Sequence, residues 1–277
     1  MTLLEQVKQL VKSGKISPNK LRGQNFCIDE KVLEQMVAAG ELNKNSCVLE
    51  IGPGLGFLTE RIQALSGQVI TVEVEQNFKK ILEIKKAFWP KVDLRFGDVL
   101  QFSNQEIANW FKPQPYQIIT NLPYGISGIF FRRFLAVTPQ PTSITAMIQA
   151  EVGERLCAIP GNLSLLGLQA QVYSKPQIVA RVEPSSFWPR PAVQSVIVKL
   201  TNIHPWLEAK ISEKRFWQLA KIGFAAKRKT LANNLAAGLH LDRLTVEQWL
   251  KQANLSLLVR AQELSVADWV KLTRYSI

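Results

Sequence analysis

Short apolar runs alternate with segments of helical spacing through the first half of the chain. Apolar runs at 46–51, 69–74, 92–96 and 116–120 predict four buried strands. Apolar residues that recur every three or four positions predict helices at 57–65, 78–87 and 129–137. Because strands and helices alternate, the predicted fold class is α/β with a mainly parallel sheet.

The two ends of the chain are predicted to be helical. A short helix should begin at residue 3 and stop before Gly14, followed by a basic linker to about residue 22, and another helix should run from about 29 to 39. From about residue 205 onward the pattern is helical again, with helices expected at 216–226, 230–237, 245–253 and 266–275. We therefore expect two domains: a sheet domain of residues 1–204 and a small helical domain of residues 205–277.

Residues suited to ligand binding follow each of the four predicted strands. They are Gly52 and Gly54, then Glu73, Asp98 and Asn121. Since the carboxyl ends of parallel strands line one edge of a sheet, these residues should share one site. Glycines permit a tight turn and a close approach of the ligand, and a carboxylate about 20 residues later suits a ribose diol.

The glycine turn favours a cofactor without phosphates. A dinucleotide fold prefers a small residue where this chain has Phe57, and no phosphate-binding G-x-x-x-x-G-K-[ST] loop is present. Glu50, just before the turn, suits an ammonium group, directly or through water. S-adenosylmethionine fits this pattern, with its amino acid end near Glu50, its ribose at Glu73 and its adenine at Asp98. An NAD-linked oxidoreductase is a distant alternative, and Asp98 has the simpler reading of a turn residue.

Charge and cysteine usage limit the class of protein. The 34 Lys and Arg residues against 22 Asp and Glu give a net charge of +12, typical of a partner of a polyanion. The run Lys227-Arg228-Lys229 is the densest basic stretch, either a phosphate contact or a solvated helix face. Three distant cysteines and two histidines fit neither a disulfide framework nor a metal knuckle, so we expect no metal and a cytoplasmic protein. We find no secretory signal and no apolar run near the roughly 18 residues of a membrane span.

The stretch Asn121-Leu122-Pro123-Tyr124 lies where an α/β sheet binds its ligand. Asn offers an amide and a carbonyl, Pro fixes the backbone while keeping its carbonyl, and Tyr adds a flat face for stacking. Taken alone, these residues also fit an ordinary turn.

Together, the motifs resemble those of the ribosomal RNA adenine dimethyltransferases, in particular the small-subunit enzymes whose loss gives kasugamycin resistance. The similarity covers about residues 22 to 275. It rests on the following segments: Glu50 to Gly56, Glu73, Gly97-Asp98, Asn121 to Tyr124, Gly23 to Phe26, Met147 to Leu156, Phe187 to Ser195, and Phe224 with Arg228 to Asn233.

The resemblance implies a Rossmann-like S-adenosylmethionine-dependent methyltransferase sheet with a small C-terminal α-helical domain that binds RNA. It implies transfer of methyl groups to N6 of two adjacent adenosines near the 3′ end of small-subunit (16S) rRNA, during biogenesis of that subunit, by a monomer, with S-adenosylhomocysteine as product. It gives Asn121, Leu122, Pro123, Tyr124 and Phe187 as catalytic residues. The cofactor would meet Asn25, Cys27, Gly52, Gly54, Glu73, Asp98 and Asn121, and Lys227, Arg228 and Lys229 would meet RNA.

Two alternatives stay open. A large-subunit rRNA adenine methyltransferase of the macrolide-resistance type shares the catalytic motifs, although the segment Arg228 to Leu231 favours the small-subunit enzymes. A non-catalytic assembly factor or a transcription-factor relative of the fold is the other. The chain departs from the family at Gly125, often Asn, at Cys27, often Leu, and at Ala192 and Gln194, often Lys and Asp.

Overall fold

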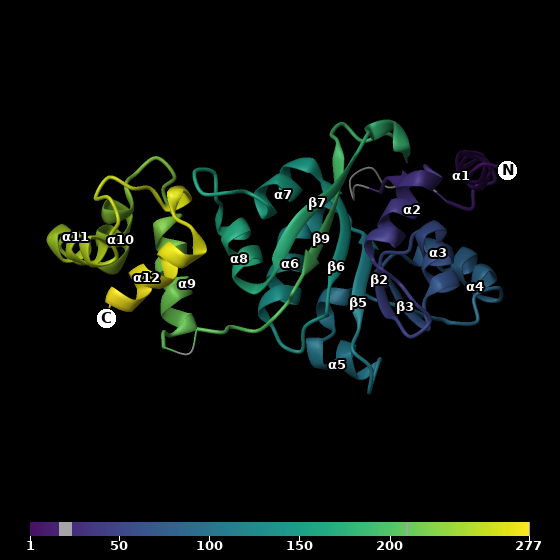
Figure 1. Cartoon of the computed structure of the whole chain (residues 1–277). Coiled ribbons are helices and arrows are strands. Elements are labelled where there is room, and N and C mark those ends of the chain that lie inside the picture. The colour runs from purple at the N-terminus through teal and green to yellow at the C-terminus, as the bar shows by residue number, and fades with distance from the viewer. Residues whose placement is uncertain (17–23, 209, 277) are drawn as a thin grey trace. The chain divides into compact units, whose positions relative to one another are not determined.

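A computed structural model describes residues 1–16, 24–208 and 210–276 of the 277-residue chain (Figure 1). Most of the predicted basic linker, and Gly23 of the N-terminal motif, lie outside these residues. Two compact units are present: residues 1–153 with 175–203, and residues 154–174 with 204–276. Within the described ranges, no helix is long and apolar enough to cross a membrane.

The first unit contains a mixed, mainly parallel seven-stranded sheet. Its strand order is β4-β3-β2-β5-β6-β9-β7. The strands are β2 (Cys47–Ile51), β3 (Gln68–Glu73), β4 (Val92–Phe96), β5 (Gln117–Asn121), β6 (Ile144–Gln149), β7 (Lys175–Val182) and β9 (Ser195–Thr201). Strands β2 to β6 pair in parallel, and β9 runs antiparallel to both β6 and β7. The α/β class and the four predicted strands are confirmed.

The strand order reverses between β2 and β5, and this reversal determines where a ligand can bind. From β2 the chain proceeds outward through β3 to β4, then returns to pair β5 with the other side of β2. A crevice opens at the carboxyl ends of strands where the order reverses in this way.

Helices cover both faces of the sheet. The first unit contains α1 (Leu3–Lys12), α2 (Glu30–Ala39), α3 (Phe57–Leu65), α4 (Lys79–Lys86), α5 (Asn104–Asn109), α6 (Ser127–Ala136) and most of α7 (Ala150–Leu156). One core joins α1 to α4 with alternate strand residues such as Val48, Val69 and Ile119. Helix α6 buries Phe130, Phe131 and Phe134. Both faces of the central strands are therefore buried, which explains why apolar residues dominate them.

Short elements complete the unit. They are the 3₁₀ turns η2 (Gln76–Phe78), η3 (Val99–Gln101), η4 (Tyr124–Ile126) and η5 (Pro184–Ser186), and the strands β1 (Phe26–Cys27) and β8 (Phe187–Trp188). Strands β1 and β8 pair antiparallel as a separate two-stranded ribbon. The ribbon joins the N-terminal motif to a loop more than 150 residues later in the chain.

The second unit is helical. It contains α8 (Leu165–Tyr173), α9 (Glu213–Gly223), α10 (Leu231–Leu239), α11 (Arg243–Gln252), the 3₁₀ turn η6 (Ala261–Glu263) and α12 (Val266–Tyr275). Ser212, Thr230, Asp242 and Ser265 cap four of these helices through side-chain oxygens. The four predicted C-terminal helices are present. Residues 154–174, including α8, pack with this unit, although the sequence pattern predicted no helix there.

Candidate methyl-transfer site

One cavity of about 590 Å³ lies at the carboxyl ends of β2, β3, β4 and β5. Its volume falls within the range of about 300–1,000 Å³ found for ligand sites. Its walls include all seven positions predicted to bind a cofactor and the whole stretch that is predicted to be catalytic. These residues are Asn25, Cys27, Gly52, Gly54, Glu73, Asp98 and Asn121 to Tyr124. Phe187 is not among the lining residues.

The glycine turn after β2 needs glycine for two reasons. Gly52, Gly54 and Gly56 have φ angles of 69°, 57° and 76°, a region that favours glycine. A Cβ on Gly56 would also lie 2.2 Å from the Trp89 ring. Because only the Phe26 ring approaches Gly54, at 3.6 Å from such a Cβ, the turn leaves its backbone open toward the cavity.

Glu73 is held by the backbone at the end of β3. One carboxylate oxygen accepts from the Gly54 N–H at 2.9 Å, and the other accepts from the Glu75 N–H at 2.8 Å. Burial raises the pKa of Glu73, and these backbone bonds oppose the rise. Each oxygen keeps further acceptor capacity, so the carboxylate can still bind a diol.

Glu50 is the most deeply buried carboxyl group of the cavity wall, with 1% of its surface exposed. The Thr59 hydroxyl donates to it at 2.6 Å. Burial raises the pKa of Glu50 to about 8, and the nearby charge of Glu73 adds to this rise. Among the described residues, no Lys or Arg forms an ion pair with either carboxyl group. The cavity therefore favours a ligand that brings its own positive charge.

Asp98 and two apolar residues form the wall nearest β4. Asp98 accepts from the Leu100 N–H at 2.9 Å and caps η3. Val74, 53% exposed, and Leu100 also line the cavity, and sequence reasoning missed both. The sequence signal that could have identified Val74 is its position as an apolar residue between two acidic residues at the end of a strand. An exposed apolar side chain there suits the face of a flat ring.

The stretch Asn121 to Tyr124, predicted to be catalytic, is fixed at three points. The Asn121 side-chain N–H donates to the Asn25 carbonyl at 3.5 Å, and the Leu122 N–H donates to Met147 O at 3.0 Å. The Tyr124 hydroxyl lies 2.8 Å from the hydroxyl of Ser195. Burial raises the pKa of Tyr124, so its ring stays neutral at ordinary pH. These ties leave the Asn121 side-chain oxygen available as an acceptor at the cavity wall.

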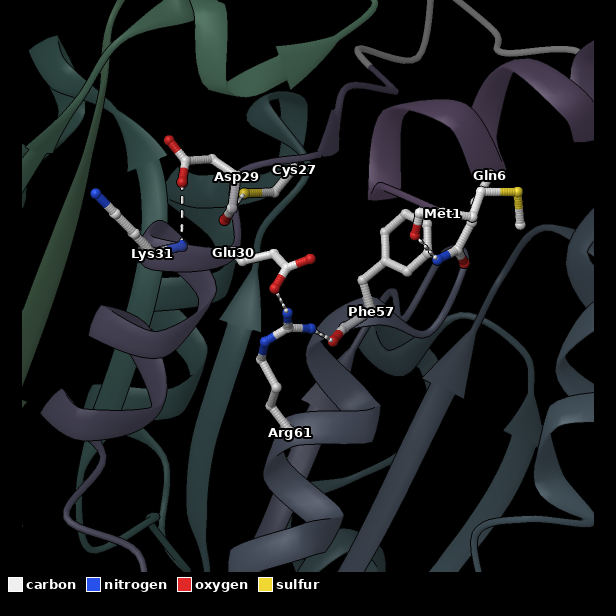
Figure 2. A network of polar contacts seen from close by, with 8 residues as sticks. All are labelled: Met1, Gln6, Cys27, Asp29, Glu30, Lys31, Phe57 and Arg61. Atoms are coloured by element: carbon white, nitrogen blue, oxygen red, sulfur yellow. Dashed lines mark hydrogen bonds and ion pairs between the residues drawn. The ribbon is translucent and has the colours of Figure 1, made fainter.

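The N-terminal part of the wall is fixed by a polar network (Figure 2). Asp29 caps α2 through the Lys31 N–H at 3.0 Å. Arg61 lies 3.6 Å from Glu30 and donates to the Phe57 carbonyl at 2.9 Å, which ties the starts of α2 and α3 together. Figure 2 shows Cys27 beside Asp29, whose carbonyl lies 3.7 Å from the thiol.

Cys27 and Phe187 stand opposite each other in the β1–β8 ribbon. Burial raises the pKa of the Cys27 thiol to about 12, so it acts as a neutral apolar wall. Phe187 is 3% exposed and belongs to the core around the ribbon. Its stacking role therefore stays a prediction.

Comparisons with known proteins identify the family. The family model described as ribosomal RNA adenine dimethylase matches residues 17–276. The chain belongs to the ribosomal RNA adenine dimethylase family. It is 36% identical to ribosomal RNA small subunit methyltransferase A of Dehalococcoides mccartyi, over 98% of this chain and 92% of that protein. The protein of the same name from Alkaliphilus metalliredigens is 34% identical over 97% and 95%.

Solved structures show the same fold. The 23S rRNA methyltransferase ErmE superposes with a TM-score of 0.72 at 24% identity, over 91% of this chain and 99% of that chain. A dimethyladenosine transferase from Plasmodium falciparum superposes with a TM-score of 0.70 at 24% identity, over 88% and 94%. The predicted Rossmann-like fold, the family and its enzyme class, an rRNA adenine dimethyltransferase, are thus confirmed.

Three of the four departures from the usual family pattern, Gly125, Ala192 and Gln194, lie at exposed positions, whereas Cys27 is buried. Gly125 has no positive φ, and a Cβ placed there meets nothing within 4 Å, so the backbone does not require glycine. Ala192 is exposed. Gln194 donates to the Glu183 carboxylate at 2.8 Å and accepts from the Ala150 N–H at 3.0 Å. Gln194 therefore helps to close the loop that carries Phe187.

The basic run lies in the second unit, in the turn between α9 and α10. Lys227, Arg228 and Lys229 are exposed. Buried Asn234 donates to the carbonyls of Gly223 at 2.7 Å and Ala226 at 3.1 Å. The turn that carries the three cations is thus held in one shape.

Proposed function

We propose that this protein transfers methyl groups from S-adenosylmethionine to N6 of two adjacent adenosines near the 3′ end of small-subunit (16S) rRNA, during biogenesis of that subunit. The observation that carries the proposal is one cavity that joins the glycine turn, Glu73 and Asp98 to Asn121-Leu122-Pro123-Tyr124. The small-subunit target is taken from the names of the relatives.

The residues of the cavity fit S-adenosylmethionine. The molecule carries a sulfonium and an ammonium, and the cavity offers Glu50 and Glu73, two buried carboxyl groups without a cationic partner among the described residues. Glu50 would face the amino acid end, and Glu73 the ribose. Asp98, Val74 and Leu100 would hold the adenine. When bound, S-adenosylmethionine would supply the methyl group as an electrophile.

The catalytic stretch would orient and activate the target amine, whose lone pair is delocalised into the adenine ring. The Asn121 side-chain oxygen would accept one N6 hydrogen. The Pro123 carbonyl, which already accepts from the Ile126 N–H at 3.2 Å, would use its second lone pair for the other. Both bonds draw the lone pair toward the methyl group, so orientation and electrostatics provide most of the rate.

Stacking would hold the extruded base. The Tyr124 ring forms one face, and Phe187 is the expected second face. Stacking contributes roughly 1–3 kcal/mol per base. No strong general base is needed, because the methylated amine is acidic enough to lose its proton to solvent. S-adenosylhomocysteine would leave between the two transfers to each nitrogen.

The exposed cations of the basic run would bind rRNA phosphates in the small ribosomal subunit, which makes affinity dependent on salt. A cytoplasmic monomer without a metal ion is the form that we expect to act.

The test is transfer of label from radioactive S-adenosylmethionine to unmethylated small subunits, with large subunits and naked rRNA in parallel. We expect N6,N6-dimethyladenosine in small-subunit rRNA. Label only in large-subunit rRNA would contradict the proposed target. Cofactor binding without label in any RNA would contradict catalysis and favour an assembly role.

A further inference from the structure

The β1–β8 ribbon connects the cofactor wall to the loop expected to hold the target base. Phe26 and Cys27 of β1 line the cavity, and Phe187 in β8 pairs directly with Cys27. Side chains directly opposite in an antiparallel pair point to the same face. Phe187 therefore stands on the Cys27 face of the ribbon, and Cys27 shares the cavity wall with Tyr124.

The ribbon is too short to fix its own register. Each strand has two residues, and an isolated hairpin even of ordinary length is marginal in water. A slip by one residue turns each side chain to the opposite face, which would put Trp188 in the place of Phe187. Contacts beyond the two paired strands must therefore fix the register.

Ser186, directly before Phe187, provides such contacts. Its carbonyl accepts from the Ile28 N–H at 2.8 Å. Its hydroxyl, in a residue only 8% exposed, donates to one carboxylate oxygen of Asp29 at 3.0 Å. The other oxygen of Asp29 caps α2. A hydrogen bond to a carboxylate is among the stronger polar contacts in proteins, and this part-buried one anchors the loop to a helix start.

The base of the same loop is also closed. Val182 at the end of β7 pairs with Ser195 at the start of β9, and Gln194 donates to Glu183 across the gap. Ser195 also contacts the hydroxyl of Tyr124. Because the two ends of the loop are already held together, the position of Phe187 depends on how the rest of the loop is fixed. The hydrogen bond from Ser186 to Asp29 fixes it.

We propose that Ser186, held by Asp29, is a positioning residue for the target adenosine, because it fixes the register that places Phe187 on the side of Tyr124. The proposal rests on the proposed function. Loss of the Ser186–Asp29 bond should affect the methyl-transfer step and the positioning of the target adenosine, and should change cofactor affinity little.

The test compares the Ser186→Ala and Ser185→Ala enzymes on unmethylated small subunits. Ser185, the neighbour, is exposed and serves as the matched control. We expect Ser186→Ala to lower kcat roughly tenfold, equivalent to about 1.4 kcal/mol. The Kd of S-adenosylhomocysteine, measured by calorimetry, should change less than about twofold, and Ser185→Ala should behave as the wild type.

A double-mutant cycle tests the bond itself. Asp29→Ser keeps a good helix cap but is too short to reach Ser186. It should reproduce the loss seen in Ser186→Ala, and the double variant should be no worse than either, since all three lack the same bond. The calorimetric stoichiometry corrects each rate for unfolded protein. If Ser186→Ala does not fold, Asp29→Ser alone decides the question.

Three results would overturn the proposal: wild-type kcat in Ser186→Ala or Asp29→Ser, losses that multiply in the double variant, or a weaker cofactor complex that accounts for the whole effect. Failure of the proposed function is a separate outcome, because the wild-type enzyme itself would then leave small subunits unlabelled.

Discussion

Cofactor binding should release a proton from Glu50. This carboxyl group is almost fully buried, is close enough to Glu73 for the charge of Glu73 to raise its pKa, and accepts one hydrogen bond from Thr59. With a pKa of about 8, it is protonated in about nine tenths of the molecules at pH 7. A ligand with a sulfonium and an ammonium favours the ionised form, so its arrival lowers this pKa and expels the proton.

The structure sets the size of the effect. At pH 7, one pH unit below the free pKa, ionising Glu50 costs on the order of 1 kcal/mol. Calorimetry at pH 7 in buffers with different ionisation enthalpies should therefore report release of about 0.9 proton per cofactor bound. The amine of the ligand is protonated both free and bound at this pH, so it contributes little to the count.

Two variants identify the source of the proton. Glu50→Gln should reduce proton release to near zero. Glu60→Gln removes an exposed carboxylate from the same helix as Thr59 and should leave the release unchanged. Wild-type binding without proton release would refute the reasoning, as would release that persists in Glu50→Gln.

Three further changes test the proposed site. Asn121→Ala should lower kcat by at least about 100-fold, on the scale of a lost transition-state contact, with cofactor affinity by calorimetry nearly intact; near-normal turnover would exclude the proposed role. Glu73→Ala should weaken cofactor binding at least about tenfold, since it removes a charged acceptor of the ribose, and unchanged affinity would show that the ribose lies elsewhere. Replacing Lys227, Arg228 and Lys229 by Ala should reduce the slope of log affinity for rRNA against log salt by up to about 2–3. An unchanged slope would show that these three residues form a solvated surface and do not contact RNA.

The central sheet was predictable because its strands are buried on both faces. Nearly every residue of β2, β3 and β5 is buried, so apolar residues dominate these runs and mark them in the sequence. Strand β7 is different: it lies at the sheet edge, contains Pro176, and alternates between half-buried and exposed residues. No strand was predicted for β6, β7 or β9, although β6 and β9 are largely buried.

The clustering of the residues expected to bind the cofactor was predictable for a geometric reason, since parallel strands place their carboxyl ends along one edge. Contacts between residues that only the tertiary fold brings together were not predictable from the sequence. Val74 and Leu100 meet only when two strand ends come together. The bonds from Ser186 to Asp29 and from Ser195 to Tyr124 span 157 and 71 residues, and neither has a local pattern.

Glu50 also connects cofactor binding to stability. Its pKa is higher in the folded state, about 8, than the ordinary value of 4.5, so the folded protein holds an extra proton between these pH values. Stability therefore falls as pH rises through this window, by up to roughly 5 kcal/mol for full ionisation. A cationic ligand would offset this cost only when it is bound. We therefore expect the buried carboxyl group that destabilises the free protein at neutral to alkaline pH to strengthen binding of the cofactor. Replacing Glu50 by Gln should accordingly give a free protein that is more stable near pH 9 and binds its cofactor less tightly.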